Sequence, residues 1–460
     1  MSARLSVLAA AATAGDQEAL VVRGQRIAFE ALAERAARAA HVLRERGAGP
    51  GAPVSLEPEL DLATCVWIHA ALALGAPLLL QPSRVSERER ARQRGIAGAR
   101  VHLRPGDAPP TSGPLLTPEP ADAASPAAIV FTSGTTGQPK GAVLSRRALV
   151  AAADASATHL GWREDDRWYL TLPPAHVGGL SVLVRCLLAR KAVVLGPPSF
   201  SVGATRRDLS AHRATLLSLV PTMLHRLLEA GWRGPGTLRA VLLGGAPATA
   251  RLLERAEDAR IPVLPTYGAT ETSAQAATRE PGTPPTAAAG VGRPLPGVEL
   301  RVVDGRVQLR GPTLFDGYLR PDGRLDPARD AEGFWDSGDL GALDEAGRLH
   351  LRGRRSDLIL SGGENVYPAE VEARLAEHLA SGELAVVGVP DDEWGERVAV
   401  AFEGVDSGRV RAAIARAGLA PHQRPRLAAL VAALPRTPSG KIDRAATRAL
   451  AFRSLEEAGR

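Results

Sequence analysis

The side chains best suited to chemistry in this sequence stand in short glycine-rich segments. Residues 132–141 read Thr-Ser-Gly-Thr-Thr-Gly-Gln-Pro-Lys-Gly. Their glycines let backbone N–H groups approach a ligand, their hydroxyls can donate hydrogen bonds, and Lys140 adds a positive charge, a combination that suits a polyphosphate. The spacing from Gly134 to Lys140 does not fit a Walker A loop, and Pro139 would obstruct a helix that began there. The segment therefore predicts a phosphate-binding loop of another kind.

Lysine is rare in this chain, and its positions are informative. Only three of the 56 basic residues are lysines, namely Lys140, Lys191 and Lys441. Lys441 ends the turn-like segment Pro-Ser-Gly-Lys at 438–441. An ammonium acts on phosphate as a compact point charge, whereas arginine presents a planar fork. Two of the three lysines thus stand where a phosphate could be approached closely.

Three further residues could complete an ATP site. Activating a carboxylate with ATP brings two anions together, so the site needs cations and oriented N–H groups where charge builds up. Glu271 can hold Mg²⁺, a hard ion that prefers oxygen ligands, and Thr270 can contact the α-phosphate. Asp339 can accept hydrogen bonds from both ribose hydroxyls. Each of these residues taken alone would be an ordinary surface or turn residue, so their order along the chain carries the prediction.

Six segments, in this order, resemble the motifs of the adenylate-forming enzymes. This superfamily comprises the acyl-CoA ligases, the peptide-synthetase adenylation domains and the beetle luciferases. The first three are a phosphate loop at Thr132, Ser133, Gly134, Thr135, Thr136, Gly137 and Lys140, an adenine-side loop at Gly244, Gly245, Ala246 and Pro247, and a nucleotide and magnesium motif at Tyr267, Gly268, Ala269, Thr270 and Glu271. The other three are a ribose motif at Ser337, Gly338, Asp339 and Leu340, a hinge region at Arg354 and 361–365 including Gly362 and Gly363, and a lysine loop at 438–441. The resemblance covers nearly the whole chain.

The resemblance implies a role for each group of residues. Lys441, Thr270, Glu271 and His176 would be catalytic, with Glu271 also the magnesium ligand. ATP and Mg²⁺ would bind at these motifs, and Ser356 would be the hinge about which the C-terminal domain rotates between two half-reactions.

The segment 357–370 distinguishes branches of the superfamily. It reads Asp-Leu-Ile-Leu-Ser-Gly-Gly-Glu-Asn-Val-Tyr-Pro-Ala-Glu and resembles the acyl-CoA ligases, whereas peptide-synthetase domains usually carry a Lys-Ile-Arg-Gly type segment. The Asp with which those domains bind an amino group is also missing. The resemblance thus implies coenzyme A as the acceptor.

The acyl-pocket candidate, 172–185, resembles that of the 2-succinylbenzoate–CoA ligases of menaquinone biosynthesis. Arg185 falls where that subfamily places a carboxylate-binding arginine, and a guanidinium can bind a carboxylate in bidentate fashion. The alternative is one more surface arginine, which the apolar neighbours Val184 and Cys186 disfavour. The role of His176 remains open, because the sequence is compatible both with a pocket residue and with a structural histidine. The expected substrate contacts are His176, Gly179, Ser181, Arg185 and Ser273.

One segment departs from the family pattern. His422-Gln423-Arg424-Pro425 stands where many relatives have Tyr-Lys-x-Pro. A contact made by that lysine with coenzyme A or phosphate would need a substitute here, and Arg424 is the candidate.

The elements that position these motifs predict an α/β fold. Helical periodicity over 29–46 and buried strand-like runs at 54–56 and 127–131 alternate as in sheets covered by helices. Further runs are expected as strands at 216–220, 240–243 and 261–264, with a helix at 248–259, and β-like segments follow at 298–303, 306–309 and 348–351. We expect a large N-terminal domain, 1–355, of helix-covered sheets with a β-rich part at about 298–353. A small mobile α+β domain, 356–460, would carry Lys441.

Two glycine- or apolar-rich segments have ordinary explanations. Gly290–Pro294 resembles a dinucleotide loop, but Pro294 and Pro296 prevent the expected helix. The apolar stretch Leu5–Ala10 leads straight into charged residues, so it predicts a first helix rather than a signal peptide.

Composition limits the classes of partner. A net charge of +6 over 460 residues with interleaved acids is too dilute for a nucleic-acid footprint. Two cysteines exclude a disulfide scaffold and a cysteine-rich metal site, and no apolar run is long enough to span a membrane. We therefore expect a cytoplasmic enzyme, compatible with a homo-oligomer, that acts on a small carboxylic acid with ATP and coenzyme A. The alternatives are a ligase for another aryl or medium-chain acid, a nucleotide-binding pseudoenzyme and, least favoured, a nucleic-acid binder.

Overall fold

The computed structural model describes residues 2–117, 121–132, 139–284, 286, 290–379, 382–437 and 441–458. These residues form two compact units. The first consists of Met1–Ala248, Leu252–Leu300 and Leu309–Trp335, and the second of Thr249–Arg251, Arg301–Gln308 and Asp336–Arg460.

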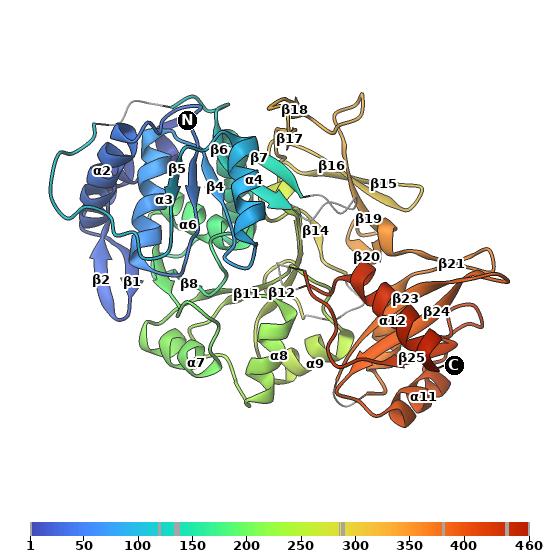
Figure 1. Ribbon diagram of the computed structural model, residues 1–460. Helices are drawn as coiled ribbons and strands as arrows, with labels where there is room; N and C mark the ends of the chain where they lie inside the picture. Colours follow the sequence, from blue (N-terminus) through green and yellow to red (C-terminus); the bar gives the residue numbers. More distant parts are fainter. Residues whose placement is uncertain are drawn as a thin grey trace. The chain divides into compact units, whose positions relative to one another are not determined.

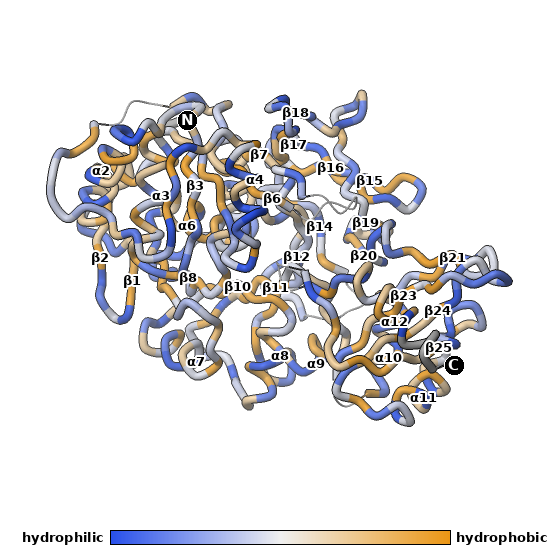
Figure 2. The backbone as a smooth tube through the Cα atoms, in the orientation of Figure 1, coloured by the Kyte–Doolittle hydropathy of each residue, from blue (hydrophilic) through white to orange (hydrophobic). Residues whose placement is uncertain are grey.

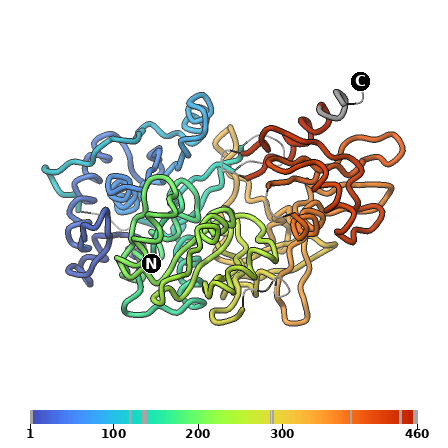
Figure 3. The backbone as a smooth tube through the Cα atoms, turned by 90° about the horizontal axis from the view of Figure 1, so that it is seen from below, coloured from blue at the N-terminus to red at the C-terminus, as the bar shows by residue number. Residues whose placement is uncertain are grey.

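A mostly parallel sheet is the centre of the first unit. Its inner strands are short and buried along most of their length, which is typical of parallel sheets covered on both faces. β1 (Glu18–Val22) pairs in parallel with β9 (Ala192–Leu195), so an early segment of the chain lies beside residues near 193, as the adjoining blue and green traces show in Figure 3. In spatial order the nine strands of the described chain are β14 (Arg293–Pro294), β13 (Ala277–Thr278), β12 (Val263–Tyr267), β11 (Ala240–Leu243), β10 (Leu216–Leu219), β8 (Arg167–Leu170), β9 (Ala192–Leu195), β1 (Glu18–Val22) and β2 (Gln25–Ala28).

Helices cover both faces of this sheet. Three of them, α7 (Val202–Ala211), α8 (Pro221–Glu229) and α9 (Ala250–Asp258), lie below the strands in Figure 1 and share one leucine-rich core with them. On the other face α6 (Val177–Ala189) contacts β8 and β9, and α2 (Phe29–Glu45) contacts β1. The hydropathy colouring agrees, with orange along β1 and blue at its turn to β2 (Figure 2).

A second sheet in the first unit holds the strand that leads into the phosphate loop. In spatial order its seven described strands are β18 (Leu325–Asp326), β17 (Gly317–Leu319), β7 (Lys140–Ser145), β6 (Pro126–Thr132), β4 (Leu78–Leu80), β3 (Val54–Leu56) and β5 (Val101–Leu103). The same part of the chain also forms the helices α1 (Val7–Ala14), α3 (Leu62–Leu74), α4 (Glu87–Ala97) and α5 (Arg146–Leu160).

α3 is the internal helix of the first unit. Nearly all of its side chains are buried, because it is apolar around its whole circumference. Asp61 caps its first turn by accepting a hydrogen bond from the Thr64 N–H at 2.8 Å, and Gly75 ends it in the left-handed conformation.

The predicted motifs follow directly after strands. β11 and β12 are parallel neighbours, so their carboxyl ends place Gly244 and Gly268 at the same sheet edge. In the other sheet, the antiparallel pair of β6 and β7 sets Thr132 opposite Lys140. Each sheet thus presents one part of the predicted nucleotide site at a strand end.

The β-rich part forms a separate four-stranded sheet. Its spatial order is β15 (Glu299–Val303), β16 (Arg306–Arg310), β19 (Trp335–Leu343) and β20 (Leu349–Arg354). In the last pair Asp339 stands opposite Arg354.

The C-terminal part of the second unit is a sheet with a core on each face. Val386, Val398 and Phe402 pack with α10 (Pro368–Ala376) and α11 (Ser407–Arg416) on one face. The alternating residues Ala385 and Ala399 pack with α12 (Arg444–Ala458) on the other. Successive side chains thus alternate between the two cores, which is the pattern of a strand buried on both faces. Its elements are β21 (Ile359–Ser361), β22 (Glu364–Val366), α10 (Pro368–Ala376), β23 (Glu383–Asp391), β24 (Gly395–Glu403), α11 (Ser407–Arg416), β25 (Leu427–Leu430) and α12 (Arg444–Ala458).

The structure confirms the predicted α/β class, but several expected elements differ at their ends. The strand expected at 348–351 spans Leu349–Arg354, and the helix expected at 248–259 spans Ala250–Asp258. The strand expected at 261–264 is shifted along the chain. That strand spans Val263–Tyr267 and not 261–264, because Pro262 has no N–H and pairing with β11 begins at Val263. The predicted domain boundary after residue 355 stays a prediction, since compactness alone does not identify the segment that rotates.

Candidate active site

The phosphate-loop region is described at its two ends. Thr132 is half-buried at the end of β6, and Lys140 is exposed at the start of β7. The Lys140 ammonium lies 5.2 Å from the centre of the Tyr318 ring, within the range of a cation–π contact. The predicted loop residues Ser133, Gly134, Thr135, Thr136 and Gly137 lie outside the described residues.

The turn after β12 holds Glu271 in a fixed place. A Cβ on Gly268 would lie 1.6 Å from the Ala274 carbonyl oxygen, so only glycine allows this turn to close. Glu271, 8 % exposed, sits in a single 3₁₀ turn, and its carboxylate accepts a hydrogen bond from the Tyr318 hydroxyl at 2.7 Å. Thr270 precedes it and is half-buried. Tyr318 thereby connects Glu271 with Lys140.

Glu271 is suited to contribute to a magnesium site, but it would not form one by itself. Among the described residues no group of three His, Cys, Asp or Glu side chains could hold a metal ion. Mg²⁺ is commonly held by one or two carboxylates together with substrate phosphates and water. The donor set therefore fits a magnesium ion that arrives with a nucleotide.

The adenine-side loop continues from β11. Gly245 takes a φ of +82°, and Gly245, Ala246 and Pro247 are all exposed. A Cβ on Gly244 would lie 2.8 Å from the Thr266 side chain on β12, so the glycine lets the two strand ends approach. Tyr267, which ends β12, is buried beside this loop.

The acyl-pocket segment forms the start of α6. His176 is half-buried at the N-cap position, and Gly179 is required because a Cβ there would lie 2.3 Å from the Pro173 carbonyl oxygen. The Ser181 hydroxyl donates to the Gly178 carbonyl at 3.0 Å. Ser181 and Arg185 are four residues apart, so they share one face of the helix.

Arg185 is a buried charge with unmet hydrogen-bonding capacity. The residue is 3 % exposed, its Nε and Nη2 have no hydrogen-bond partner within the described part of the chain, and its guanidinium lies 5.4 Å from the Trp168 ring centre. Burial lowers the pKa of Arg185 to about 10, which still leaves it protonated at neutral pH. An unpaired buried cation is unfavourable, so this position favours an anionic ligand.

Ser273 and Gln275 lie in the turn after Glu271. The Ser273 hydroxyl is buried and donates to the Thr313 carbonyl at 2.9 Å, so its described contact is with the backbone. The buried Gln275 side chain donates to Thr278 at 2.8 Å, while its Oε1 has no partner among the described atoms. Gln275 therefore offers a free acceptor that the sequence analysis did not single out.

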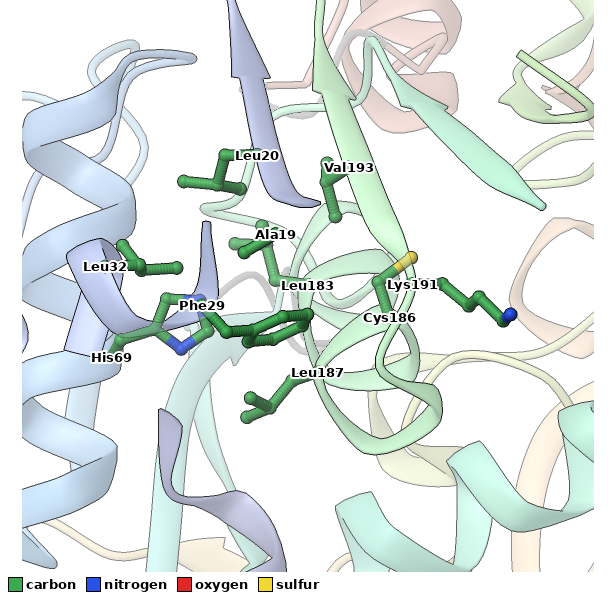
Figure 4. Close-up of a pocket in the computed structure, with 10 residues that line it drawn as sticks. All are labelled: Ala19, Leu20, Phe29, Leu32, His69, Leu183, Cys186, Leu187, Lys191 and Val193. Carbon is green, nitrogen blue, oxygen red and sulfur yellow. The ribbon is translucent and has the colours of Figure 1, made fainter. Parts of the chain in front are cut away.

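The small cavity under α6 is not the acyl pocket. Its volume is about 10 Å³, room for about one water molecule, and Figure 4 shows mostly apolar side chains around it. One of its polar residues is His69, whose pKa burial lowers to about 4. The lining residues are Ala19, Leu20, Phe29, Leu32, His69, Leu183, Cys186, Leu187, Lys191 and Val193.

The second unit brings together Asp339 of the predicted ribose motif and Arg354 of the predicted hinge region. Arg354 Nε lies 2.9 Å from an oxygen of Asp339, across the pair of β19 and β20. Asp339 is 8 % exposed, and its own N–H donates to the Ser337 hydroxyl. The arginine thus holds one carboxylate oxygen and fixes the orientation of the group.

The expected hinge and glycine loop lie in consecutive turns of the second unit. Ser356 is exposed in a 3₁₀ turn, where its hydroxyl donates to Asp357 Oδ1 at 3.0 Å. Gly362 and Gly363 both have positive φ and connect β21 to β22 in a tight hairpin. A Cβ on Gly362 would lie 2.8 Å from the Trp394 ring, so this glycine is also required sterically.

Lys441 is exposed at the C-terminal end of its loop. The Lys441 carbonyl accepts a hydrogen bond from the Thr437 N–H at 2.8 Å, and Arg436 and Ile442 form an antiparallel bridge. The predicted residues 438–440 lie outside the described residues. In the divergent segment, Gln423 accepts from the Ala420 N–H and the Arg424 side chain is exposed.

Two positioning residues were missed by the sequence analysis. Tyr318 lies 47 residues beyond Glu271. Arg444 lies only three residues beyond Lys441, but its partners Asp357 and Glu372 are far away in sequence. Only a pairing of distant segments reveals such contacts, so no local signal could have found them.

Sequence and structure comparisons agree with this geometry. Residues 104–319 match the model of the AMP-binding enzyme family, and residues 370–441 match the AMP-binding enzyme C-terminal domain. A 2-succinylbenzoate–CoA ligase of Bacillus pumilus is 33 % identical, with 93 % of this chain and 94 % of that protein covered. Within the described residues, no helix is long and apolar enough to cross a membrane.

Two solved structures of o-succinylbenzoate CoA synthetase from Bacillus subtilis are similar to the chain. The complex with the acyl-adenylate OSB-AMP is 30 % identical, with a TM-score of 0.89 over 95 % of this chain and 96 % of that one. The complex with ATP and magnesium ion is 30 % identical, with a TM-score of 0.87 over 95 % and 98 %. The resemblance inferred from the motifs is thereby confirmed, and the chain belongs to the AMP-binding family of adenylate-forming enzymes, with 2-succinylbenzoate–CoA ligases among its relatives.

Proposed function

We propose that this protein converts 2-succinylbenzoate, ATP and coenzyme A into 2-succinylbenzoyl-CoA, AMP and diphosphate, a step of menaquinone biosynthesis. The observation that carries the choice of acid is Arg185. A dicarboxylic substrate needs a cation for the carboxylate that does not react. The buried guanidinium supplies one, and its Nε and Nη2 have no partner among the residues that the structure describes.

The position of Arg185 suits such an acid. Arg185 lies nine residues after the N-cap residue His176, which corresponds to about 13 Å along the helix axis. The second carboxylate would therefore be bound at Arg185, on the face of α6 that Ser181 shares and about two turns from the start of the helix. Trp168 is fully buried, and its ring holds the guanidinium in place by a cation–π contact.

The first half-reaction would form an acyl-adenylate. An oxygen of the substrate carboxylate attacks the α-phosphorus of ATP, the bond to the β-phosphate oxygen breaks, and diphosphate leaves. Lys140, Thr270 and Lys441 would stabilise the developing charge, and Asp339 would bind the ribose. Glu271 would hold Mg²⁺, which neutralises phosphate charge when bound.

The second half-reaction would transfer the acyl group to the thiol. The sulfur of coenzyme A attacks the acyl carbon, the bond to the adenylate oxygen breaks, and AMP leaves. Rotation about Ser356 would withdraw Lys441 and bring the Gly362–Gly363 turn to the thiol. Cytoplasmic location, assembly as a homo-oligomer and a coenzyme A contact at Arg424 stay predictions.

A substrate panel tests the proposal. We expect 2-succinylbenzoate to cause diphosphate release at far higher kcat/KM than benzoate or octanoate. Arg185→Ala should lower kcat/KM for 2-succinylbenzoate by about 30- to 1,000-fold, as expected for loss of one partner of a buried charge pair, and should leave benzoate turnover nearly unchanged. Arg207→Ala, at a side chain 71 % exposed on α7, is the matched control.

The same assay separates the alternatives. Preference for benzoate or octanoate would indicate a ligase for another acid, and ATP binding without diphosphate release would indicate a pseudoenzyme. Indifference of 2-succinylbenzoate turnover to Arg185→Ala would contradict the pocket assignment. Salt-dependent retention on DNA would support the alternative that the protein binds nucleic acid.

A further inference from the structure

The loop that carries Lys441 is closed at its base by backbone contacts. The Thr437 N–H donates to the Lys441 carbonyl and the Asp443 N–H donates to the Pro435 carbonyl, both at 2.8 Å. The chain then enters α12 without any intervening segment, because this helix begins at Arg444. The position of Lys441 is therefore tied to the first turn of α12.

Arg444 binds three other segments of the second unit at once. Its Nη1 and Nη2 lie 2.5 and 2.8 Å from the two carboxylate oxygens of Glu372 on α10. Its Nε lies 3.1 Å from Asp357 Oδ2, and its Nη1 also donates to the Val386 carbonyl on β23 at 2.9 Å. Bidentate pairing of this kind fixes both distance and orientation.

The partners of Arg444 are themselves held. Glu372 Oε1 accepts a hydrogen bond from the Val386 N–H at 2.7 Å, so the carboxylate cannot turn away from the arginine. The side chains of Arg444, Glu372 and Asp357 are 23 %, 19 % and 26 % exposed, so water screens the cluster only in part. One guanidinium thus lies between two carboxylates in a partly dry site.

The cluster reaches the predicted hinge. Asp357 follows Ser356 directly, and its other oxygen, Oδ1, accepts the Ser356 hydroxyl at 3.0 Å. A continuous series of polar contacts therefore runs from the hinge residue Ser356 through Asp357 to Arg444 and on to the base of the Lys441 loop.

We propose that Arg444 is a positioning residue for adenylate formation, which couples the hinge turn to the Lys441 loop so that the lysine moves as a rigid part of its domain. The proposal rests on the proposed function, because it requires Lys441 to act on the α-phosphate. Without Arg444 the loop base could shift independently of the hinge. A displacement of about 1 Å at a reacting group can lower a rate about a hundredfold.

The test compares the two half-reactions in Arg444→Met. We expect diphosphate release to fall at least tenfold in kcat, with the KM values for ATP and acid within about twofold of wild type. Thioester formation from supplied acyl-adenylate and coenzyme A should stay within about threefold, because Lys441 is not needed there. Asp357→Asn, which keeps the Glu372 pair, should show a smaller loss in the same direction and covers the case that Arg444→Met fails to fold.

A double-mutant cycle separates positioning from mere folding. In a Lys441→Ala background, Arg444→Met should cause no further loss of adenylate formation, because the group that it positions is gone. Arg448→Met, one turn further along α12, removes an ion pair with Glu396 at 3.0 Å and should leave diphosphate release unchanged.

Equal losses in both half-reactions, or additive losses in the double mutant, would overturn the inference and leave Arg444 a structural residue. These failures are distinct from failure of the proposed function, in which the wild-type protein itself would not release diphosphate with 2-succinylbenzoate.

Discussion

Tyr318 joins two charged residues that the sequence separates widely. Its hydroxyl donates to Glu271 and its ring lies beneath the Lys140 ammonium, so one side chain orients a carboxylate and a cation. Both charged groups lie next to strand ends, yet neither strand fixes their side chains. In the proposed MgATP site, the tyrosine would thereby provide the pre-organisation that binding requires.

Tyr318→Phe should raise the magnesium concentration needed for half-maximal diphosphate release several-fold. The substitution removes a single hydrogen bond worth about 1 kcal/mol but keeps the ring under Lys140. Titration of diphosphate release with MgCl₂ at saturating ATP measures the effect. Tyr169→Phe, whose hydroxyl is 3.4 Å from Asp208, is the control, and an unchanged titration in Tyr318→Phe would contradict the role.

At the scale of elements, the active-site turns depend on glycines that no other residue can replace. The turn after β12 is the most demanding, since the Ala274 carbonyl occupies the place of any Cβ at Gly268. The short strands β10 to β12 are fixed by burial and pairing, so an added atom must displace the turn and not the sheet. This turn carries Thr270 and Glu271, so its displacement should affect catalysis as well as stability.

Gly268→Ala should destabilise the protein by about 1–3 kcal/mol and abolish most diphosphate release. Thermal unfolding and the release assay on the same preparation measure both effects. Gly203→Ala, in α7 with open space around the added methyl, should instead raise stability slightly. Wild-type activity in Gly268→Ala would show that the turn relaxes without cost.

At the scale of the whole molecule, one buried histidine makes stability depend on pH. His69 is 3 % exposed in α3, its Nδ1 has no partner among the described atoms, and burial lowers its pKa from 6.5 to about 4. The unfolded chain therefore binds a proton between pH 6.5 and 4 that the folded chain does not. Folding stability is unaffected by His69 above pH 6.5 and falls as the pH decreases toward 4.

His69→Leu should flatten this dependence. Between pH 7 and pH 4 the wild type should lose up to about 3 kcal/mol more stability than the variant, since each unit of pKa shift corresponds to about 1.4 kcal/mol. Urea unfolding at both pH values measures the difference. The exposed His225, changed to Leu, should show the wild-type slope, and equal slopes in all three proteins would contradict the assignment.

The sequence by itself determined the α/β class, most strand positions and the order of the nucleotide motifs. Buried strands correspond to short apolar runs in the sequence, and the motif turns correspond to glycines beside polar residues. Both signals are therefore local. Asp339 and Arg354 were also predicted individually, and the pairing of β19 with β20 brings them together.

Only the tertiary structure decided which side chains meet. It left Arg185 buried with two donors that have no partner in the described part of the chain. It also joined Glu271 to Tyr318 and linked Arg444 with Asp357 and Glu372. These contacts connect segments between 47 and 87 residues apart, and the energy that selects them comes from packing of whole elements. The residue types that could do chemistry are thus local information, whereas the partner that orients each of them is set by the fold.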